Sequence, residues 1–358
     1  MHPLDQPSTY SSLDPSGVRG RIRDLPSQCR QAWDRTAALS LPDAYRKATQ
    51  VVVLGMGGSA IGGDLLRDAV SHECLVPVRV LRDYSLPADV RAGSLVIGSS
   101  YSGETEETLT AFAEASKRGC HLVVAAGGGH LRSEAERRGL PFLAIQYVGE
   151  PRSVLGYGFF LLLGLLHRLG LISDKSQDLE DMERALEALD ARLEPGVPLD
   201  TNPAKELASL VHNHIAVIYG GGILEAIARR WKGQMNENGK NWAFFESFPE
   251  LNHNAVVGYD LPQDIASRML VIMLHSDYLH PRVKKRYQVT QEILAQKGVA
   301  FRVVNSEGSS IASQMMSSVF FGDFTSYYLA LLNGVDPSPV ATITFLKERL
   351  KSIDSQDS

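Results

Sequence analysis

The chain has 358 residues, of which 44% are hydrophobic and 22% are charged, and its formal net charge is −5. These values are ordinary for a globular protein of about two domains, and the acidic balance disfavours a nucleic-acid-binding surface. Three scattered cysteines form no zinc or disulfide pattern, and the N-terminus lacks the pattern of a signal peptide. The longest apolar run, residues 154–166, is well short of the roughly 20 residues that span a membrane. We therefore expect a cytoplasmic protein with no nucleic-acid or membrane partner.

The first half of the chain alternates short apolar runs with helical patterns. Residues 1–50 favour a helical extension that covers the domain after it. The run VVVLG at residues 51–55 is typical of a central parallel strand buried on both faces. Similar runs follow at intervals, each before a helical pattern, which indicates a doubly wound parallel sheet. The predicted strands are 51–55, 76–81, 95–98, 121–126 and 142–145.

The second half repeats this plan after a helical connection. The connection, residues 153–200, holds an apolar helix at 154–169 and an amphipathic one at 179–193. A strand, a glycine cluster and a helix then recur from residue 215, so we expect two doubly wound, flavodoxin-like α/β subdomains in tandem, at 51–152 and 201–358. The predicted elements of the second are strands 215–219, 269–274 and 299–304 and helices 281–297, 310–332 and 339–351.

A glycine-rich turn, GMGGSAIGGD, follows the first predicted strand. Glycines let a ligand approach the backbone closely, and free N–H groups at a helix start attract anions. The candidate binding residues here are Gly57, Gly58 and Ser59. Their spacing departs from the G-x-G-x-x-G dinucleotide fingerprint, so we favour a phosphate monoester as the ligand. A dinucleotide site and a purely structural turn remain alternatives.

A hydroxyl-rich turn, SSYSGETEET, follows the predicted strand 95–98. It places Ser100, Ser102 and Thr105 at a strand end and a helix start, which is where ligands bind in parallel sheets. Three hydroxyls beside a helix N-terminus make a neutral phosphate cradle that needs neither lysine nor magnesium. The alternative is a capping box formed by Ser102 with Thr105 and Glu106.

The segment 236–254, NENGKNWAFFESFPELNHN, concentrates acid, amide and imidazole groups among aromatic residues. We expect a folded loop that holds Glu237 and His253 against an apolar floor, because proton transfer needs titratable groups in a partly dry site. A carboxylate at a helix C-terminus is electrostatically unfavourable, which argues against an idle Glu237. A capping role for Glu237 and a structural role for His253 remain alternatives. The floor would consist of Trp242, Phe244, Phe245 and Phe248.

Together these stretches, with EPRS at residues 150–153, resemble the sugar isomerase (SIS) fold and, within it, the bifunctional phosphoglucose/phosphomannose isomerases. The resemblance covers nearly the whole chain. It implies that glucose 6-phosphate and mannose 6-phosphate are interconverted with fructose 6-phosphate through a cis-enediol. It also implies a homodimer with shared active sites, and no cofactor or metal.

The resemblance assigns roles to individual residues. Glu237 would move a proton between C1 and C2, while Arg152 would stabilise the enediolate charge. His253, supplied by the partner subunit, would assist ring opening, and Lys347 would help ring opening or hold sugar hydroxyls. One departure is Glu104, which replaces an asparagine of the family and would repel a phosphate unless it points away. The 6-phosphate would be held by Gly57, Gly58, Ser59, Ser100, Ser102 and Thr105.

Three other functions remain open at this point. A non-catalytic sugar-phosphate sensor would need an effector module, and residues 1–50 show none. An isomerase of another sugar phosphate and a nucleotide-dependent oxidoreductase are the remaining alternatives. His275, Asp277 and His280 could be drawn as metal ligands, but no further cluster supports them, and enediol chemistry with a carboxylate base needs no metal.

Overall fold

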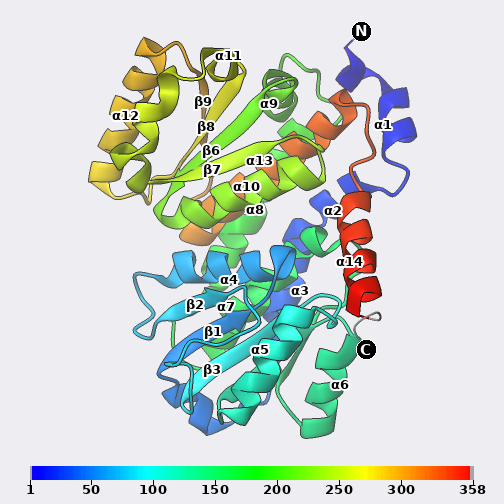
Figure 1. Cartoon of the computed structure of the whole chain (residues 1–358), viewed down its shortest axis with the longest axis vertical. Coiled ribbons are helices and arrows are strands. Elements are labelled where there is room, and N and C mark those ends of the chain that lie inside the picture. The colour runs from blue at the N-terminus through cyan, green and yellow to red at the C-terminus, as the bar shows by residue number, and fades with distance from the viewer. Residues whose placement is uncertain (1, 355–358) are drawn as a thin grey trace.

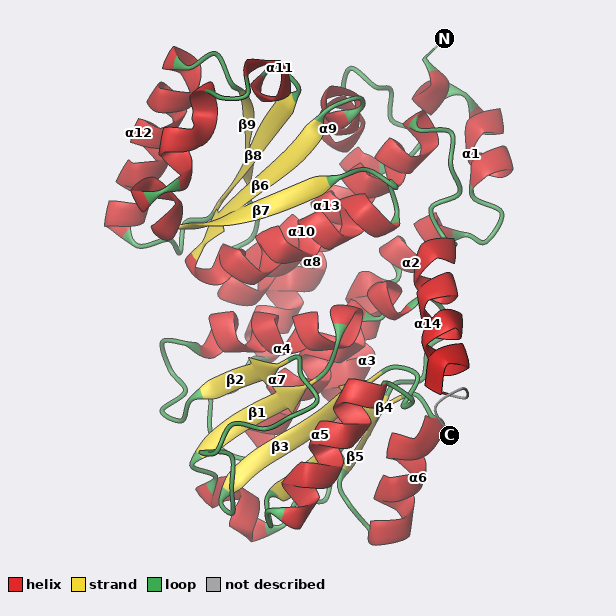
Figure 2. Cartoon of the chain, viewed as in Figure 1, coloured by secondary structure: helices red, strands yellow, loops and turns green. Residues whose placement is uncertain are grey.

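A computed structural model describes residues 2–354 and contains two parallel β-sheets, one in each half of the chain (Figures 1 and 2). The first sheet has the strand order β2-β1-β3-β4-β5. The order of successive strands therefore reverses between β1 and β3. Doubly wound sheets commonly bind ligands in a crevice at this point, at the carboxyl ends of the two strands. The strands are β1 Gln50–Leu54, β2 Val78–Leu81, β3 Ser94–Ser100, β4 His121–Ala126 and β5 Phe142–Ala144.

Helices cover both faces of the first sheet because its central strands are apolar on both sides. Val51 and Val53 pack with one set of helices, while Val52 and Leu54 pack with the other. One face carries α3 Leu25–Ala37, α4 Gly57–Val70 and α7 Leu155–Arg168, and the other carries α5 Glu106–Lys117 and α6 Gly129–Arg138. The short helices α1 Pro7–Leu13 and α2 Val18–Arg23 precede them.

The second sheet repeats the topology of the first with one strand fewer. Its order is β7-β6-β8-β9, so β6 and β8 correspond to β1 and β3. These findings confirm the predicted fold of two doubly wound halves. The strands are β6 Ile215–Gly221, β7 Ala243–Phe248, β8 Met269–His275 and β9 Ala300–Asn305, and the helices are α8 Ser176–Leu193, α9 Pro203–Val211, α10 Glu225–Glu237, α11 Gln263–Ala266, α12 Pro281–Gln296, α13 Ile311–Leu332 and α14 Ala341–Asp354.

A single apolar core runs through the helices between the two sheets. Helix α7 packs on α3 and α4, whereas α8 packs on α13, and α4 of the first half contacts α10 of the second. The division into 1–50, 51–152, 153–200 and 201–358 stays a proposal, since the two connecting helices each join a different half. Within residues 2–354, no helix combines the length and apolarity needed to cross a bilayer.

The expected loop at 236–254 is wrong in part, because its middle forms the edge strand β7, paired in parallel with β6. A strand points alternate side chains to opposite faces, so the aromatic residues do not gather on one floor. Trp242 is 72% exposed and Phe244 is 46% exposed. Phe248 alone among the four aromatic residues is buried, and its ring stacks on Tyr287.

The close approach of α4 to α7 depends on Gly62. A Cβ there would lie 2.3 Å from the carbonyl oxygen of Gly158, which cannot move without displacing α7. We expect Gly62→Ala to lower the free energy of unfolding by about 1–3 kcal/mol, as measured by denaturant titration. Gly233→Ala is the matched control, because nothing lies within 4 Å of a Cβ there. The control should gain about 0.5–1 kcal/mol from helix propensity, and equal stability of the two variants would contradict this account.

Candidate active site

The glycine turn and the hydroxyl turn meet at the crevice of the first sheet. The Ser59 hydroxyl accepts a hydrogen bond from the backbone N–H of Tyr101 at 3.1 Å. The Ser99 hydroxyl in turn donates to the carbonyl oxygen of Ser59 at 3.1 Å. A Cβ at Gly55 would lie 2.9 Å from the carbonyl oxygen of Ser99, so only glycine permits this approach. The two predicted phosphate-binding turns therefore form one unit.

Within the hydroxyl turn, the side chains of Ser100 and Thr105 meet just before α5. The Ser100 and Thr105 hydroxyl oxygens are 2.8 Å apart, and the N–H of Gly103 donates to Ser100. Ser102 accepts a hydrogen bond from the N–H of Glu104. Thr105 is the N-cap of α5, but its side chain bonds none of the helix N–H groups, so the capping-box alternative is wrong. A helix N-terminus flanked by hydroxyls suits an anion.

Glu104 is directed toward α6. One of its carboxylate oxygens accepts the backbone N–H of His130 at 2.8 Å, and the other lies 2.5 Å from the His130 Nδ1. These atoms belong to the first turn of α6, where the helix dipole favours negative charge. The departure from the family pattern therefore has a local explanation, because α6 offsets the charge of this carboxylate.

Arg152 connects the crevice to the second half of the chain. Its turn, Pro151–Ser153, lies against the glycine turn, since a Cβ at Gly58 would be 2.8 Å from the Pro151 carbonyl oxygen. The Arg152 side chain is only 4% exposed. Its Nε donates to Asn238 Oδ1 at 2.6 Å, and its Nη2 donates to the carbonyls of Pro337 and Ser338 at 2.7 Å each. Burial lowers the pKa of Arg152, while the charge of Glu237 acts in the opposite direction.

Glu237 is the last residue of α10, and its carboxylate lies 3.6 Å from Nη1 of Arg152. Its side chain is one third exposed, so it reaches solvent on one side and the buried guanidinium on the other. Lys240 donates to the backbone carbonyl of Glu237. Burial, followed by the charge of Arg152, lowers the pKa of Lys240. A carboxylate beside a buried cation can exchange a proton with a carbon acid whose conjugate base is negative.

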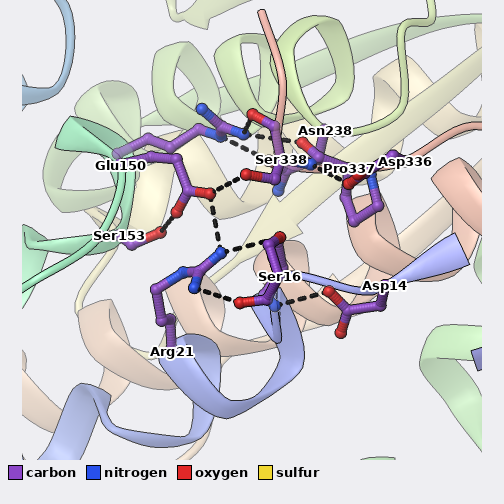
Figure 3. A network of polar contacts seen from close by, with 12 residues as sticks. Asp14, Ser16, Arg21, Glu150, Ser153, Asn238, Asp336, Pro337 and Ser338 are labelled. Atoms are coloured by element: carbon purple, nitrogen blue, oxygen red, sulfur yellow. Dashed lines mark hydrogen bonds and ion pairs between the residues drawn. The ribbon is translucent and has the colours of Figure 1, made fainter. Parts of the chain in front are cut away.

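A second carboxylate, Glu150, joins α2 and the segment before α14 to its own turn by hydrogen bonds (Figure 3). It accepts hydrogen bonds from Arg21 at 2.8 Å, from Ser153 at 2.9 Å and from the Ser338 hydroxyl. Burial alone would raise the pKa of Glu150, but the bond from Ser338 and the others outweigh it, so the pKa lies below its usual value. Sequence reasoning assigned Glu150 no role, although it opens the EPRS stretch.

The structure does not bring His253 to Glu237 within one chain. Glu237 precedes the amino end of β7, whereas His253 closes a short 3-10 helix beyond its carboxyl end. The six residues of β7 span about 20 Å, so a single folded loop does not hold Glu237 and His253 together as expected. Lys347 lies on α14, where every side chain from 341 to 350 is exposed.

The structure brings together the glycine turn, the hydroxyl turn, Arg152 and Glu237 through the contacts described above. His275, Asp277 and His280 do not form a metal site, since residues 2–354 contain no group of three or more His, Cys, Asp or Glu side chains placed to hold a metal ion.

Comparisons with known proteins identify relatives of this chain. Residues 200–350 match the family model described as the bacterial phospho-glucose isomerase C-terminal SIS domain. A bifunctional phosphoglucose/phosphomannose isomerase of Caldicellulosiruptor bescii is 41% identical over 335 residues, covering 93% of this chain and 98% of the relative. One from Aquifex aeolicus is 35% identical over 303 residues, covering 84% and 90%.

Among solved structures, a hypothetical protein of Thermus thermophilus has a TM-score of 0.71 at 21% identity, covering 94% of this chain and 90% of its own. A glucose-6-phosphate isomerase-like protein of the same organism has a TM-score of 0.63 at 20% identity, covering 95% and 99%. These two likenesses support the fold alone. The sequence relatives go further, and they place this chain in the family of bifunctional phosphoglucose/phosphomannose isomerases.

Proposed function

We propose that the protein interconverts glucose 6-phosphate and mannose 6-phosphate with fructose 6-phosphate through a cis-enediol. The observation that carries the proposal is the Glu237–Arg152 pair, because the turn of Arg152 packs directly on the phosphate-binding glycine turn. The names of the relatives from Caldicellulosiruptor bescii and Aquifex aeolicus support the choice of sugars.

The phosphate would bind first, in the crevice of the first sheet. Hydroxyls of Ser59, Ser100, Ser102 and Thr105 donate to its oxygens, together with N–H groups at the start of α5. The phosphate takes no part in the reaction, so its binding energy serves to position C1 and C2 of the open-chain sugar. Glu104 stays out of this contact because α6 holds its carboxylate.

Glu237 would then act as the base. Its carboxylate removes the proton from C2 of the aldose and later returns it to C1. The O2 hydroxyl proton moves to O1 in the intermediate, and the ketose results. Between these steps the sugar carries an enediolate charge, and Nη1 of Arg152 stabilises it. Tolerance of both epimers follows if C2 is reprotonated from either face of the planar enediol in the reverse reaction.

Ring opening would depend on groups that lie away from Glu237 in one chain. We assign His253 to the site of the partner subunit in a homodimer, and Lys347 to the same step through α14. Exposed apolar side chains on α14 and beside the edge strand β7 support a second subunit, because such surface is seldom left in water. They include Trp242, Phe244, Phe345, Leu346 and Leu350.

The choice of substrates is tested directly with the purified protein. We expect fructose 6-phosphate to form from both glucose 6-phosphate and mannose 6-phosphate, measured by a colorimetric ketose assay. Turnover of glucose 6-phosphate alone would reduce the protein to a single isomerase. Binding of both sugars without turnover would favour the non-catalytic sensor instead.

The role of Glu237 is tested by Glu237→Gln. Because Gln cannot accept the proton, we expect kcat to fall about 10²–10⁴-fold, with little change in KM or thermal stability. Glu225→Gln, the same change at the first residue of α10, is the control and should keep wild-type kcat. Wild-type turnover in Glu237→Gln would exclude it as the base.

The shared site is tested by mixing two inactive variants, Glu237→Gln and His253→Ala, after dissociation and reassociation. If His253 serves the partner's site, a mixed dimer has one site with both changes and one with neither. Random pairing then restores about a quarter of wild-type activity. Mixtures that stay as inactive as either variant would show instead that each chain supplies both Glu237 and His253 to its own site.

A further inference from the structure

A row of buried polar side chains lies between α10 and α13, in a contact that is otherwise apolar. Arg230 donates to Asp323 at 2.6 Å, and Gln234 donates to the other carboxylate oxygen at 2.9 Å. One turn further along α10, Asn238 donates to the Ser326 hydroxyl at 3.0 Å. Residues 230, 234 and 238 recur every four positions, so they share one face of α10. We call these five residues the polar ladder.

Stability alone does not account for the polar ladder. The side chains of Arg230 and Asp323 are 4% and 9% exposed, so the ion pair between them lies in the core. Removing two charges from water is costly, and replacing such a pair with well-packed apolar residues is often neutral or stabilising. The pair therefore calls for a role that apolar side chains could not perform.

The polar ladder holds Arg152 at two points. Arg230 donates to the backbone carbonyl of Arg152 at 3.3 Å, and Asn238 accepts from its guanidinium at 2.6 Å. Glu237 lies on α10 between Gln234 and Asn238. Arg152 also donates to the carbonyls of Pro337 and Ser338, which follow α13. A rotation or slide of α10 against α13 would therefore pull Arg152 between its two sets of partners and change its position relative to Glu237.

The polar ladder does not touch the substrate. Arg152, Arg230, Asn238 and Asp323 line a cavity of about 10 Å³, which is room for a single water molecule at most. A sugar phosphate cannot enter it. Any influence of Asp323 on turnover therefore passes through Arg152 and Glu237.

We propose that Asp323 is a positioning residue for the isomerisation, acting through Arg230 and Gln234 to hold the Glu237–Arg152 pair in register. This inference rests on the proposed function. It predicts an effect on kcat with little effect on KM, since the phosphate-binding turns lie in the first sheet and are held by other contacts.

The first test is Asp323→Asn, assayed for kcat and KM with glucose 6-phosphate. We expect kcat to fall about ten- to a hundredfold, because a misplacement of about 1 Å at a reacting centre has effects of this size. KM should stay within about twofold of the wild-type value. A wild-type kcat in Asp323→Asn would overturn the proposal.

A second variant separates positioning from folding. The triple change Arg230→Met, Gln234→Leu and Asp323→Leu removes both charges together with the buried amide that bonds Asp323, so it is expected to fold with about wild-type thermal stability. We expect this stable protein to show the same loss of kcat as Asp323→Asn. Stable protein with wild-type kcat would overturn the proposal.

Lys205→Met provides the matched control. Lys205 is fully buried on α9 and pairs with Asp5 at 2.9 Å, beside Tyr328 of α13. This variant loses a buried ion pair on the same helix layer, so stability should fall while kcat stays at the wild-type value. An equal loss of kcat in Lys205→Met would overturn the proposal by showing that any destabilisation slows turnover. The proposed function is judged by other results. It is wrong if the wild-type protein has no isomerase activity, or if Glu237→Gln keeps wild-type turnover.

Discussion

One buried guanidinium, that of Arg152, fixes how the two halves of the chain meet. Its donors go to Asn238 at the end of α10 and to two carbonyls of the segment that leads into α14. Its remaining nitrogen faces Glu237. Burying a cation costs free energy unless each of its hydrogen-bond partners is in place. The segments that bind Arg152 are therefore expected to become ordered together. The position of Glu237 beside Arg152, whose turn packs on the glycine turn of the first half, follows from this one requirement.

The duplicated halves would have different tasks in the proposed isomerase. The proposed phosphate site lies at the switch point between β1 and β3, where doubly wound sheets commonly bind ligands. In the second sheet the corresponding Gly220 packs on the turn that follows it, since a Cβ there would lie 2.3 Å from the Leu224 carbonyl oxygen. That half contributes the opposite end of α10, which carries Glu237. In this proposal the first half binds the phosphate and the second half supplies the base.

Sequence patterns predicted the features that depend on local chemistry. The apolar runs predicted the parallel strands, and the serine and glycine turns predicted the crevice. Edge strand β7 was missed because its mixed polar and aromatic residues lack the continuous apolar run of a central strand. The direction of the Glu104 side chain depends on His130 of α6, which is 26 residues away in the sequence. Asp323 pairs with Arg230, which is 93 residues away in the sequence. A lone acid inside the apolar helix α13 was a signal for the polar ladder, but its partner is set by the tertiary fold alone.

The central claim is that one site is assembled from the hydroxyl turns of the first half and the carboxylate of the second. The most direct test is a crystal structure with a sugar-acid 6-phosphate whose carboxylate mimics the enediolate. The account predicts the phosphate on Ser59, Ser100, Ser102 and Thr105, with the carboxylate on Arg152 and its neighbouring carbon facing Glu237. A phosphate bound at Arg152, or a sugar that leaves Glu237 beyond hydrogen-bonding reach of C1 and C2, would contradict it.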